Sequence, residues 1–279
     1  MRKPTTLRFG SAGIPLCTKP RDTHNGIATV RKLGLEGMEL EFVRSIFVTK
    51  EKAPAVKKTS EEHDVALTCH APYFINLNSD DKKKLKASKD RILNSARISA
   101  LCGAWSCCFH PGFYQKQDPK KVYKTITAEV KDIAKTLKKE GVDIWLRPET
   151  TGKGSQFGEI NELINMAAEV EGVLPCIDFA HLHARSNGKY NTKQEVLDVL
   201  TLVEKKLGKE ALQNMHIHYN GIRYSEKGEL NHLNLKDSDA KWKDVLQAWH
   251  DFKLKGQVTC ESPNIEKDAM LLQKHWKTL

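Results

Sequence analysis

The stretch KKEGVDIWLRPET (residues 138–150) contains the pattern that decides the fold of this chain. A helical segment ends at Gly141, an apolar run follows it, and the run ends in Glu149. Glycine supplies the left-handed backbone that closes a helix, and a short apolar run after it is typical of a buried parallel strand. The same order recurs along the chain, with closing glycines expected at Gly34, Gly103, Gly172, Gly208 and Gly256.

Eight apolar runs alternate with amphipathic segments. The runs are LRFGSAG (7–13), LEGMELEF (35–42), VALTCHA (65–71), AWSCCFH (104–110), VDIWLRPE (142–149), VLPCIDFA (173–180), MHIHY (215–219) and QVTCE (257–261). Three of the helices are expected at 83–101, 122–137 and 193–207. This alternation over 279 residues predicts an α/β fold, a single (β/α)8 TIM barrel domain covering residues 1–279. A doubly wound open sheet is the alternative, but it would gather ligands at one switch point.

The composition favours an intracellular protein that does not enter a membrane. The apolar runs are too short to cross a bilayer, and the N-terminus MRKPTTLRFG lacks the apolar core of a signal peptide. The seven cysteines are an odd number and most lie in strand runs, so we expect reduced, buried thiols. The net charge of +10 fits a polyanionic partner, and it fits equally well a solvated lysine-rich surface.

One side chain of a metal-ligand type ends each of six consecutive strands. These residues are His70, His110, Glu149, Asp178, His216 and Glu261. In a closed parallel barrel the C-terminal ends of the strands ring one mouth, so the six side chains would converge. Imidazoles and carboxylates suit zinc, manganese or iron, and six of them exceed what one tetrahedral ion needs. The sequence therefore predicts a metal site that holds more than one ion.

Further histidines lie close to these strand ends. His181 follows Asp178 by three residues, an offset that can turn its ring back toward the mouth. His232 lies in a long loop after the seventh strand, and His216 and His218 are expected to point to opposite faces of that strand. Structural roles are the alternative interpretation of these residues. A lone strand-end histidine can be a hydrogen-bonded structural residue, and a strand-end acid can cap the next helix.

Seven segments together resemble endonuclease IV, the family of metal-dependent apurinic/apyrimidinic endonucleases, in an archaeal-type branch. The segments are LTCHAPYFINL, CCFHPG, RPETTGKGSQFG, CIDFAHLHAR, MHIHYNG, HLNL and CESP, within residues 67–263. The resemblance implies a (β/α)8 barrel that holds two or three Zn²⁺ ions, with Mn²⁺ as a possible substitute.

The resemblance also assigns ligands to each ion. In order of the ions, the ligand groups are His70, His110 and Glu149; Glu149, Asp178, His216 and Glu261; and His181 with His232. The family has an aspartate two residues before this last histidine, where this chain has Leu230. Glu229 is the neighbouring carboxylate, and we expect it to replace the aspartate.

The activity implied by the resemblance is hydrolysis of the phosphodiester 5′ to an abasic site in duplex DNA, which leaves a 3′-hydroxyl and a 5′-deoxyribose phosphate. Glu149 and Glu261 are the expected catalytic residues, the first bridging two ions and the second orienting the nucleophile. Tyr73 and Phe74 are expected to enter the base stack, and Arg44 to contact the DNA backbone. We expect a monomeric DNA repair enzyme of the cytoplasm, associated with the nucleoid.

Two other functions stay open. A sugar isomerase or epimerase on the same barrel would hold a single divalent ion with four ligands equivalent to Glu149, Asp178, His216 and Glu261. A DNA-binding module that has lost its chemistry is consistent with Leu230 in place of the family's aspartate. The number of ions per chain separates the first alternative from a nuclease, because the nuclease needs two or three.

Overall fold

The eight expected strands form one parallel sheet in the structure, a computed structural model that describes residues 4–279. The strands are β1 (Leu7–Ala12), β2 (Gly37–Glu41), β3 (Ala66–His70), β4 (Ser106–Phe109), β6 (Trp145–Pro148), β8 (Cys176–Asp178), β9 (Met215–Tyr219) and β12 (Gly256–Cys260). Their order in the sheet is β6-β4-β3-β2-β1-β12-β9-β8. The (β/α)8 architecture is therefore confirmed.

Closure of the barrel depends on the seam between β6 and β8. No regular ladder joins these two strands within residues 4–279, but isolated parallel bridges pair Leu146 with Val173 and Glu149 with Cys176. The amide of Thr150 donates to the carbonyl of Cys176 at 3.1 Å. The seam thus brings the ends of β6 and β8 together.

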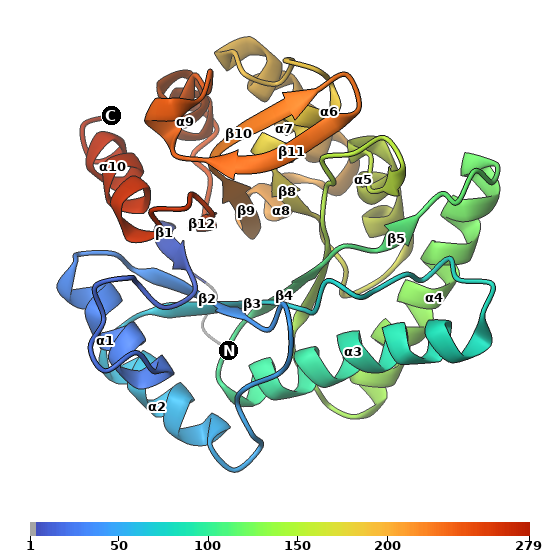
Figure 1. Ribbon diagram of the computed structural model, residues 1–279, viewed down its shortest axis with the longest axis horizontal. Helices are drawn as coiled ribbons and strands as arrows, with labels where there is room; N and C mark the ends of the chain where they lie inside the picture. Colours follow the sequence, from blue (N-terminus) through green and yellow to red (C-terminus); the bar gives the residue numbers. More distant parts are fainter. Residues whose placement is uncertain (1–3) are drawn as a thin grey trace.

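Helices surround the sheet on its outer side (Figure 1). They are α1 (Thr23–Lys32), α2 (Ala53–Glu62), α3 (Lys82–Leu101), α4 (Pro119–Lys139), α5 (Ile160–Glu169), α6 (Phe179–Arg185), α7 (Lys193–Leu207), α8 (Lys209–Leu212), α9 (Trp242–Asp251) and α10 (Glu266–Trp276), with a 3-10 turn at Leu235–Asp237. The expected helices at 83–101, 122–137 and 193–207 are confirmed as α3, α4 and α7. Aspartates cap the first two, and a capping box of Thr192 and Glu195 starts the third.

Five of the six expected closing glycines have the left-handed backbone. The φ angles are 79°, 82°, 70°, 80° and 80° for Gly34, Gly103, Gly141, Gly172 and Gly208. The expectation for Gly256 was wrong, because Lys253 (φ 51°) follows α9 and Gly256 (φ 128°) begins β12. A side chain at Gly256 would overlap the backbone of Met215 on the neighbouring strand, so close strand approach is the reason for this glycine.

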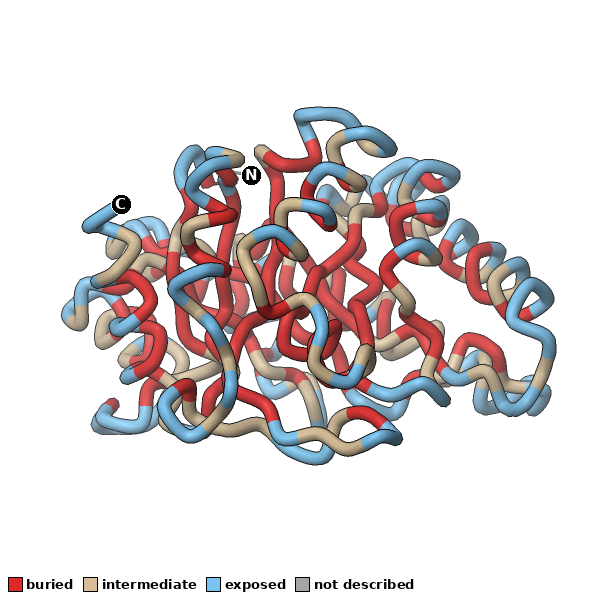
Figure 2. The backbone as a smooth tube through the Cα atoms, turned by 90° about the horizontal axis from the view of Figure 1, so that it is seen from above, coloured by how far each residue is buried: buried red, intermediate tan, exposed pale blue. Residues whose placement is uncertain are grey.

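Buried residues concentrate in the central strands and on the helix faces that cover them (Figure 2). The apolar core lies between the sheet and the helices and includes Phe9, Leu40, Ile126 and Leu200. The inside of the barrel is polar instead. It contains Thr68, Ser106, Arg147, His216 and Gln257, all of them buried.

Two short antiparallel strand pairs extend the barrel at the C-terminal ends of its strands. They are β10 (Gly221–Ser225) with β11 (Gly228–Leu233), and β5 (Gly112–Phe113) with β7 (Gln156–Phe157). The first pair lies across the front of the molecule in Figure 1. Among residues 4–279, no helix combines the length and the apolar composition needed to span a bilayer.

Replacing Gly10 with alanine tests the close contact between β1 and β2. A Cβ at Gly10 would overlap the Gly37 carbonyl, whereas nothing lies within 4 Å of a Cβ at Gly154. We expect Gly10→Ala to lower the free energy of unfolding by about 2–3 kcal/mol, the upper part of the range for overpacked cores. Urea denaturation measures this change, with Gly154→Ala as the control. Equal stability of the two variants would contradict the tight β1–β2 contact.

Candidate metal centre

Glu149 is the centre of the barrel mouth. It follows β6, it is fully buried, and its Oε2 lies 3.2 Å from His70 Nε2 and 3.1 Å from His110 Nε2. Its Oε1 lies 3.1 Å from His218 Nδ1 and 3.3 Å from His181 Nδ1. Four imidazoles, from β3, the loop after β4, α6 and β9, therefore surround one carboxylate.

Asp178 and Glu261 complete the inner wall of the mouth. Asp178 Oδ1 accepts from the amide of His181 at 2.8 Å. Asp178 therefore caps α6, as the structural interpretation of the strand-end acids predicted. Its Oδ2 is left buried without a hydrogen-bond partner and lies 3.1 Å from His181 Nδ1. Glu261 Oε1 lies 3.5 Å from His218 Nδ1, and its Oε2 is also buried without a partner.

The β10–β11 hairpin places a second set of donors beside His181. Glu229 Oε2 lies 3.6 Å from His181 Nε2, and Glu229 Oε1 lies 3.8 Å from His232 Nε2. The hairpin rests on α6 through Ile222, which contacts a small apolar cluster with Ala180 and Ala184. The three polar residues therefore form a group in which every ligand atom lies within 4.8 Å of the others.

A β-bulge at Leu230 explains how Glu229 comes to face the mouth. In β11, Asn231 pairs with Arg223 and Glu229 pairs with Tyr224, which leaves Leu230 as the extra residue. Residues three apart on a regular strand face opposite sides, but the extra residue returns Glu229 to the side of His232. Gly152 leaves the room that the Glu229 side chain occupies.

The predicted orientation of the two β9 histidines was wrong. Residues two apart on a strand face the same side, and both His216 Nε2 and His218 Nε2 lie 2.9 Å from the Glu39 carboxylate inside the barrel. His218, not His216, borders Glu149 and Glu261. His216 lies deeper and its Nδ1 is 2.9 Å from Ser106 Oγ, so the place in the mouth that the sequence assigned to His216 is taken by His218.

Two carboxylates of β2 were not predicted as site residues from the sequence. Glu39 and Glu41 both face the barrel interior, and Glu41 is paired in register with His70 at the mouth. The signal was present in GMELE, where two acids alternate with apolar residues over positions 37–41.

The hydrogen bonds of three mouth histidines match those of metal ligands. The Nδ1–H groups donate to backbone carbonyls, His70 to Ala71 at 2.7 Å, His181 to Thr150 at 2.9 Å and His232 to Glu261 at 3.3 Å. Each ring therefore presents its Nε2 atom toward the carboxylates. Such outer hydrogen bonds fix the tautomer of metal-bound histidines, so this donor set fits divalent cations such as zinc.

Electrostatics in the mouth also favour cations. Burial alone would lower the pKa of His70, but its contact with Glu149 and the charge of Glu41 raise that pKa to about 10. Burial raises the pKa of Asp178 to about 7. Burial would also raise the pKa of Glu149, but the surrounding imidazoles hold it well below its usual range. Protons thus take the place of the missing positive charge when no ion is bound.

The rim of the mouth carries exposed aromatic side chains. Tyr73 and Phe74 follow β3 and are 55% and 68% exposed. Tyr73 lies edge-on to His70 with 5.4 Å between ring centroids, and Arg91 donates to the Phe74 carbonyl at 2.9 Å. Arg44 is exposed on the loop after β2, next to Val43, whose carbonyl accepts from the Tyr73 amide at 3.1 Å. All three predicted DNA-contacting residues therefore lie on adjacent loops at the mouth.

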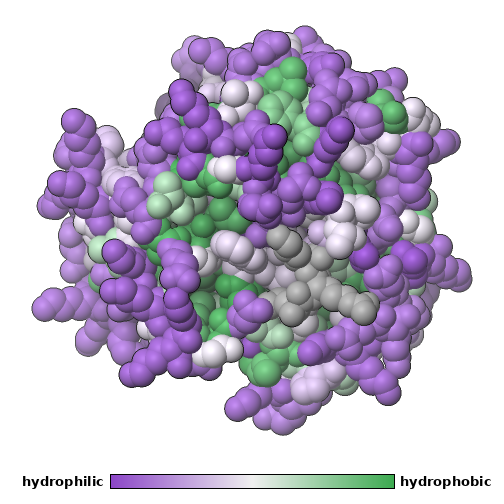
Figure 3. Space-filling view, turned by 180° about the vertical axis from the view of Figure 1, so that it is seen from behind, coloured by the Kyte–Doolittle hydropathy of each residue, from purple (hydrophilic) through white to green (hydrophobic). Residues whose placement is uncertain are grey.

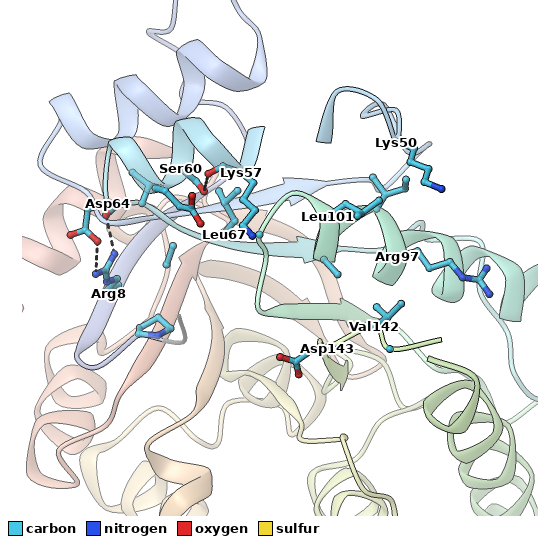
Figure 4. A pocket seen from close by; sticks show the side chains of 18 of the residues that line it. Arg8, Lys50, Lys57, Ser60, Asp64, Leu67, Arg97, Leu101, Val142 and Asp143 are labelled. Atoms are coloured by element: carbon cyan, nitrogen blue, oxygen red, sulfur yellow. Dashed lines mark hydrogen bonds and ion pairs between the residues drawn. The ribbon is translucent and has the colours of Figure 1, made fainter. Parts of the chain in front are cut away.

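A hollow of about 1580 Å³ lies at the opposite end of the barrel. Arg8 pairs with Asp64 there at 3.0 Å (Figure 4). Arg97, also in the lining, pairs with Glu140 at 2.6 Å. The face seen from behind has hydrophilic side chains around apolar ones (Figure 3). Among residues 4–279, the histidines of the possible metal-ligand groups lie inside the barrel and at its mouth, so the mouth is the candidate site.

Comparisons with known proteins agree with this architecture. The sequence profile of a family described as xylose isomerase-like TIM barrel matches residues 27–279. An uncharacterized protein of Methanocaldococcus jannaschii is 40% identical over 279 residues, which covers 100% of both chains. A probable endonuclease 4 of Mycoplasma pneumoniae is 26% identical over 172 residues, 57% of this chain and 55% of that protein. The chain thus aligns with about half the length of that relative.

Solved structures of two functional classes share the fold. Endonuclease IV from Thermus thermophilus has a TM-score of 0.71 and 18% identity, over 96% of this chain and 98% of that one. A D-tagatose 3-epimerase-like protein has a TM-score of 0.71 and 14% identity, over 96% of each chain. At these identities the likeness extends to the fold alone.

Metal loading of the mouth should release protons. Below the pKa of about 10, the His70 ring of the ion-free protein carries an extra proton that a metal ligand cannot keep. We expect zinc added at about pH 8 to release on the order of one or two protons per chain, and zinc affinity to rise with pH toward about 10. A pH indicator in weakly buffered solution measures the release. Zinc binding without proton release would contradict this account of His70.

Proposed function

Because the chain belongs to the xylose isomerase-like TIM barrel family, we propose that its mouth is the active site of a metal-dependent phosphodiesterase that incises DNA 5′ to abasic sites. The observation that carries the proposal is the number of donors in the mouth. Beyond Glu149, Asp178 and Glu261, it gathers His70, His110, His181, Glu229 and His232. One divalent ion cannot use all of these ligands, whereas two or three ions can.

The sequence relatives support the same choice. Seven of the similar curated proteins are described as endonuclease 4 or its homologues, at 23–26% identity. The net charge of +10 and the exposed aromatic rim fit a polyanionic duplex with a base stack that can be opened. A monomeric state and a cytoplasmic location near the nucleoid stay predictions.

The chemistry is addition of water across the P–O3′ bond, so that the water oxygen bonds to phosphorus and its proton ends on the 3′-oxygen. Divalent cations in the mouth would polarise the phosphodiester and make water an effective nucleophile near neutral pH. Glu149 bridges the two halves of the mouth with its two carboxylate oxygens. The unpartnered Oε2 of Glu261 orients the attacking water by accepting its hydrogen bond.

The hairpin residues serve the leaving-group side in this proposal. Glu229 and His232 lie on β11, next to His181 and apart from the His70–His110 side of Glu149. Glu229 precedes the position of the aspartate in the endonuclease IV pattern by one residue, and the bulge at Leu230 turns it toward His181. We propose that these three residues hold the cation that neutralises the departing 3′-oxygen.

A sugar epimerase is the second candidate, because an epimerase-like protein matches the fold with the same TM-score as endonuclease IV. Such an enzyme would need one divalent ion with four ligands, Glu149, Asp178, Glu261 and a β9 histidine, for which His218 lies in the place assigned to His216. Elemental analysis of the purified protein distinguishes the two proposals. Two or more ions per chain support the nuclease, and a single ion with epimerase activity supports the alternative.

Glu261→Gln tests the catalytic assignment. The amide keeps the shape of the side chain but loses the charge and one acceptor, so we expect nicking of a duplex with one abasic analogue to fall by about 100-fold or more. Thermal unfolding should change little. Glu210→Gln, on the exposed helix α8 before β9, is the control and should keep normal activity. Near-normal nicking by Glu261→Gln would rule out this role.

Phe74→Ala tests the aromatic wedge. Loss of base stacking costs about 1–3 kcal/mol, so binding to abasic duplex should weaken by about tenfold while metal content stays the same. Fluorescence anisotropy with a labelled duplex measures the affinity. Leu101→Ala removes an exposed apolar side chain at the opposite end of the barrel and should have no effect. Equal affinity of both variants would place the wedge elsewhere.

A further inference from the structure

A row of buried polar side chains connects the floor of the barrel with the mouth. Arg147 Nε lies 3.1 Å from Ser106 Oγ, and Ser106 Oγ lies 2.9 Å from His216 Nδ1. Glu39 Oε2 lies 2.9 Å from His216 Nε2, and Glu39 Oε1 lies 2.9 Å from His218 Nε2. All five residues are buried. Of this group, the interior network, His218 alone borders the carboxylates of the mouth.

The two charged groups of the interior network determine the direction of its hydrogen bonds. The Arg147 guanidinium can only donate, and it donates to Ser106 Oγ. The Ser106 hydroxyl then has its one hydrogen available for His216 Nδ1. The Glu39 carboxylate can only accept, and it faces His216 Nε2. A neutral His216 ring therefore accepts at Nδ1 and carries its proton on Nε2.

Glu39 and the two rings that face it have no alternative partners. Both oxygens of Glu39 and the Nε2 atoms of His216 and His218 are buried, and no other group in residues 4–279 forms a hydrogen bond with them. The 2.9 Å contacts are within hydrogen-bond distance, although they are bent. A buried N–H without an acceptor is costly, and an unpaired buried carboxylate costs more. These four atoms can therefore be satisfied only by one another.

The His218 ring lies between carboxylates on both of its sides. Its Nδ1 is 3.1 Å from Glu149 Oε1 and 3.5 Å from Glu261 Oε1, whereas its Nε2 is 2.9 Å from Glu39. A neutral imidazole has one N–H and cannot donate to both sides. With the proton on Nε2, Nδ1 presents a lone pair to the mouth, where a cation can bind to it and to the mouth carboxylates. A carboxylate behind a metal-bound histidine fixes the tautomer and the ring orientation.

We propose that Glu39 is a positioning residue of the mouth that acts through His218, and that His216 supports it. Glu39 accepts the Nε2–H of His218 and so keeps Nδ1 free for the cation. His216, tied to Ser106, holds the second Glu39 oxygen in place. Three other mouth histidines donate to backbone carbonyls instead, which no substitution can remove. This inference rests on the proposed metal binding at the mouth, but not on the identity of the substrate.

Zinc affinity in matched variants tests the role of Glu39. Protein stripped of metal is titrated with zinc in competition with a chromophoric chelator. Glu39→Gln keeps the shape of the side chain but replaces one acceptor with an N–H donor, so we expect one zinc ion to bind about 10–100-fold more weakly. Thr259→Val removes a buried hydroxyl outside the interior network and should bind zinc normally. Equal zinc affinity of Glu39→Gln and the unsubstituted protein would overturn the inference.

A double-mutant cycle tests whether Glu39 and His216 act through the same ring. His216→Gln should weaken zinc binding less than Glu39→Gln does, and the double variant should lose no more affinity than Glu39→Gln alone. Independent structural damage would add instead, so fully additive losses would overturn the assignment.

The protonation of His218 provides a readout that a purely structural role of Glu39 would not change. Long-range proton–nitrogen NMR of the zinc-loaded, unsubstituted protein should show His218 with a protonated Nε2 and a metal-bound Nδ1. A protonated Nδ1 would overturn the inference, and this measurement decides if the variants do not fold. An unsubstituted protein that binds no zinc would overturn the metal centre together with the inference, whereas normal binding with unchanged variants overturns the inference alone.

Discussion

The concentration of negative charge around Glu149 is the constraint on which the site depends. Its two oxygens contact imidazoles from β3, from β9, from the loop after β4 and from α6. Asp178, Glu261 and Glu41 add buried oxygens that lack hydrogen bonds. Water cannot stabilise these charges at such depth, so positive charge must be supplied from within the site. Divalent cations would provide that charge, and the raised pKa of His70 reflects the same preference for positive charge in the mouth.

The fold meets this constraint because its apolar core is outside the sheet. Residues such as Ile126 and Leu200 are buried between strands and helices, which leaves the inside of the barrel for polar groups. The floor of the interior contains Arg147, a buried guanidinium that donates to Asn214 and Ser106. Polar groups thus continue from the floor through Glu39 and His216 to the mouth. Few barrel positions remain for aliphatic packing, so bound cations would help to stabilise the interior.

The sequence was sufficient to predict the strands, the main helices and most of the mouth. Glycine-closed helices and apolar runs are local signals, and His70, His110, Glu149 and Asp178 end their strands at one level. His216 and His218 are two residues apart on β9, so both side chains face the barrel interior, and His218 is the one nearer the mouth. The position of Glu229 depends on a bulge at Leu230 that appears only when β11 is paired with β10. Pairing between strands is non-local, so it cannot be predicted from the pattern of any one segment.

The seam between β6 and β8 has a consequence for how the barrel moves. Two isolated bridges join these strands, whereas β12 pairs with β1 over five residues. Local opening of the sheet is therefore expected at this seam, where isolated bridges and no regular ladder hold the strands together. Glu149 and Asp178 flank the same seam, so an ion shared between them would act as a cross-link. Binding would then slow local opening of the barrel at the β6–β8 seam, and removal of the ion by a chelator would restore the original opening rate.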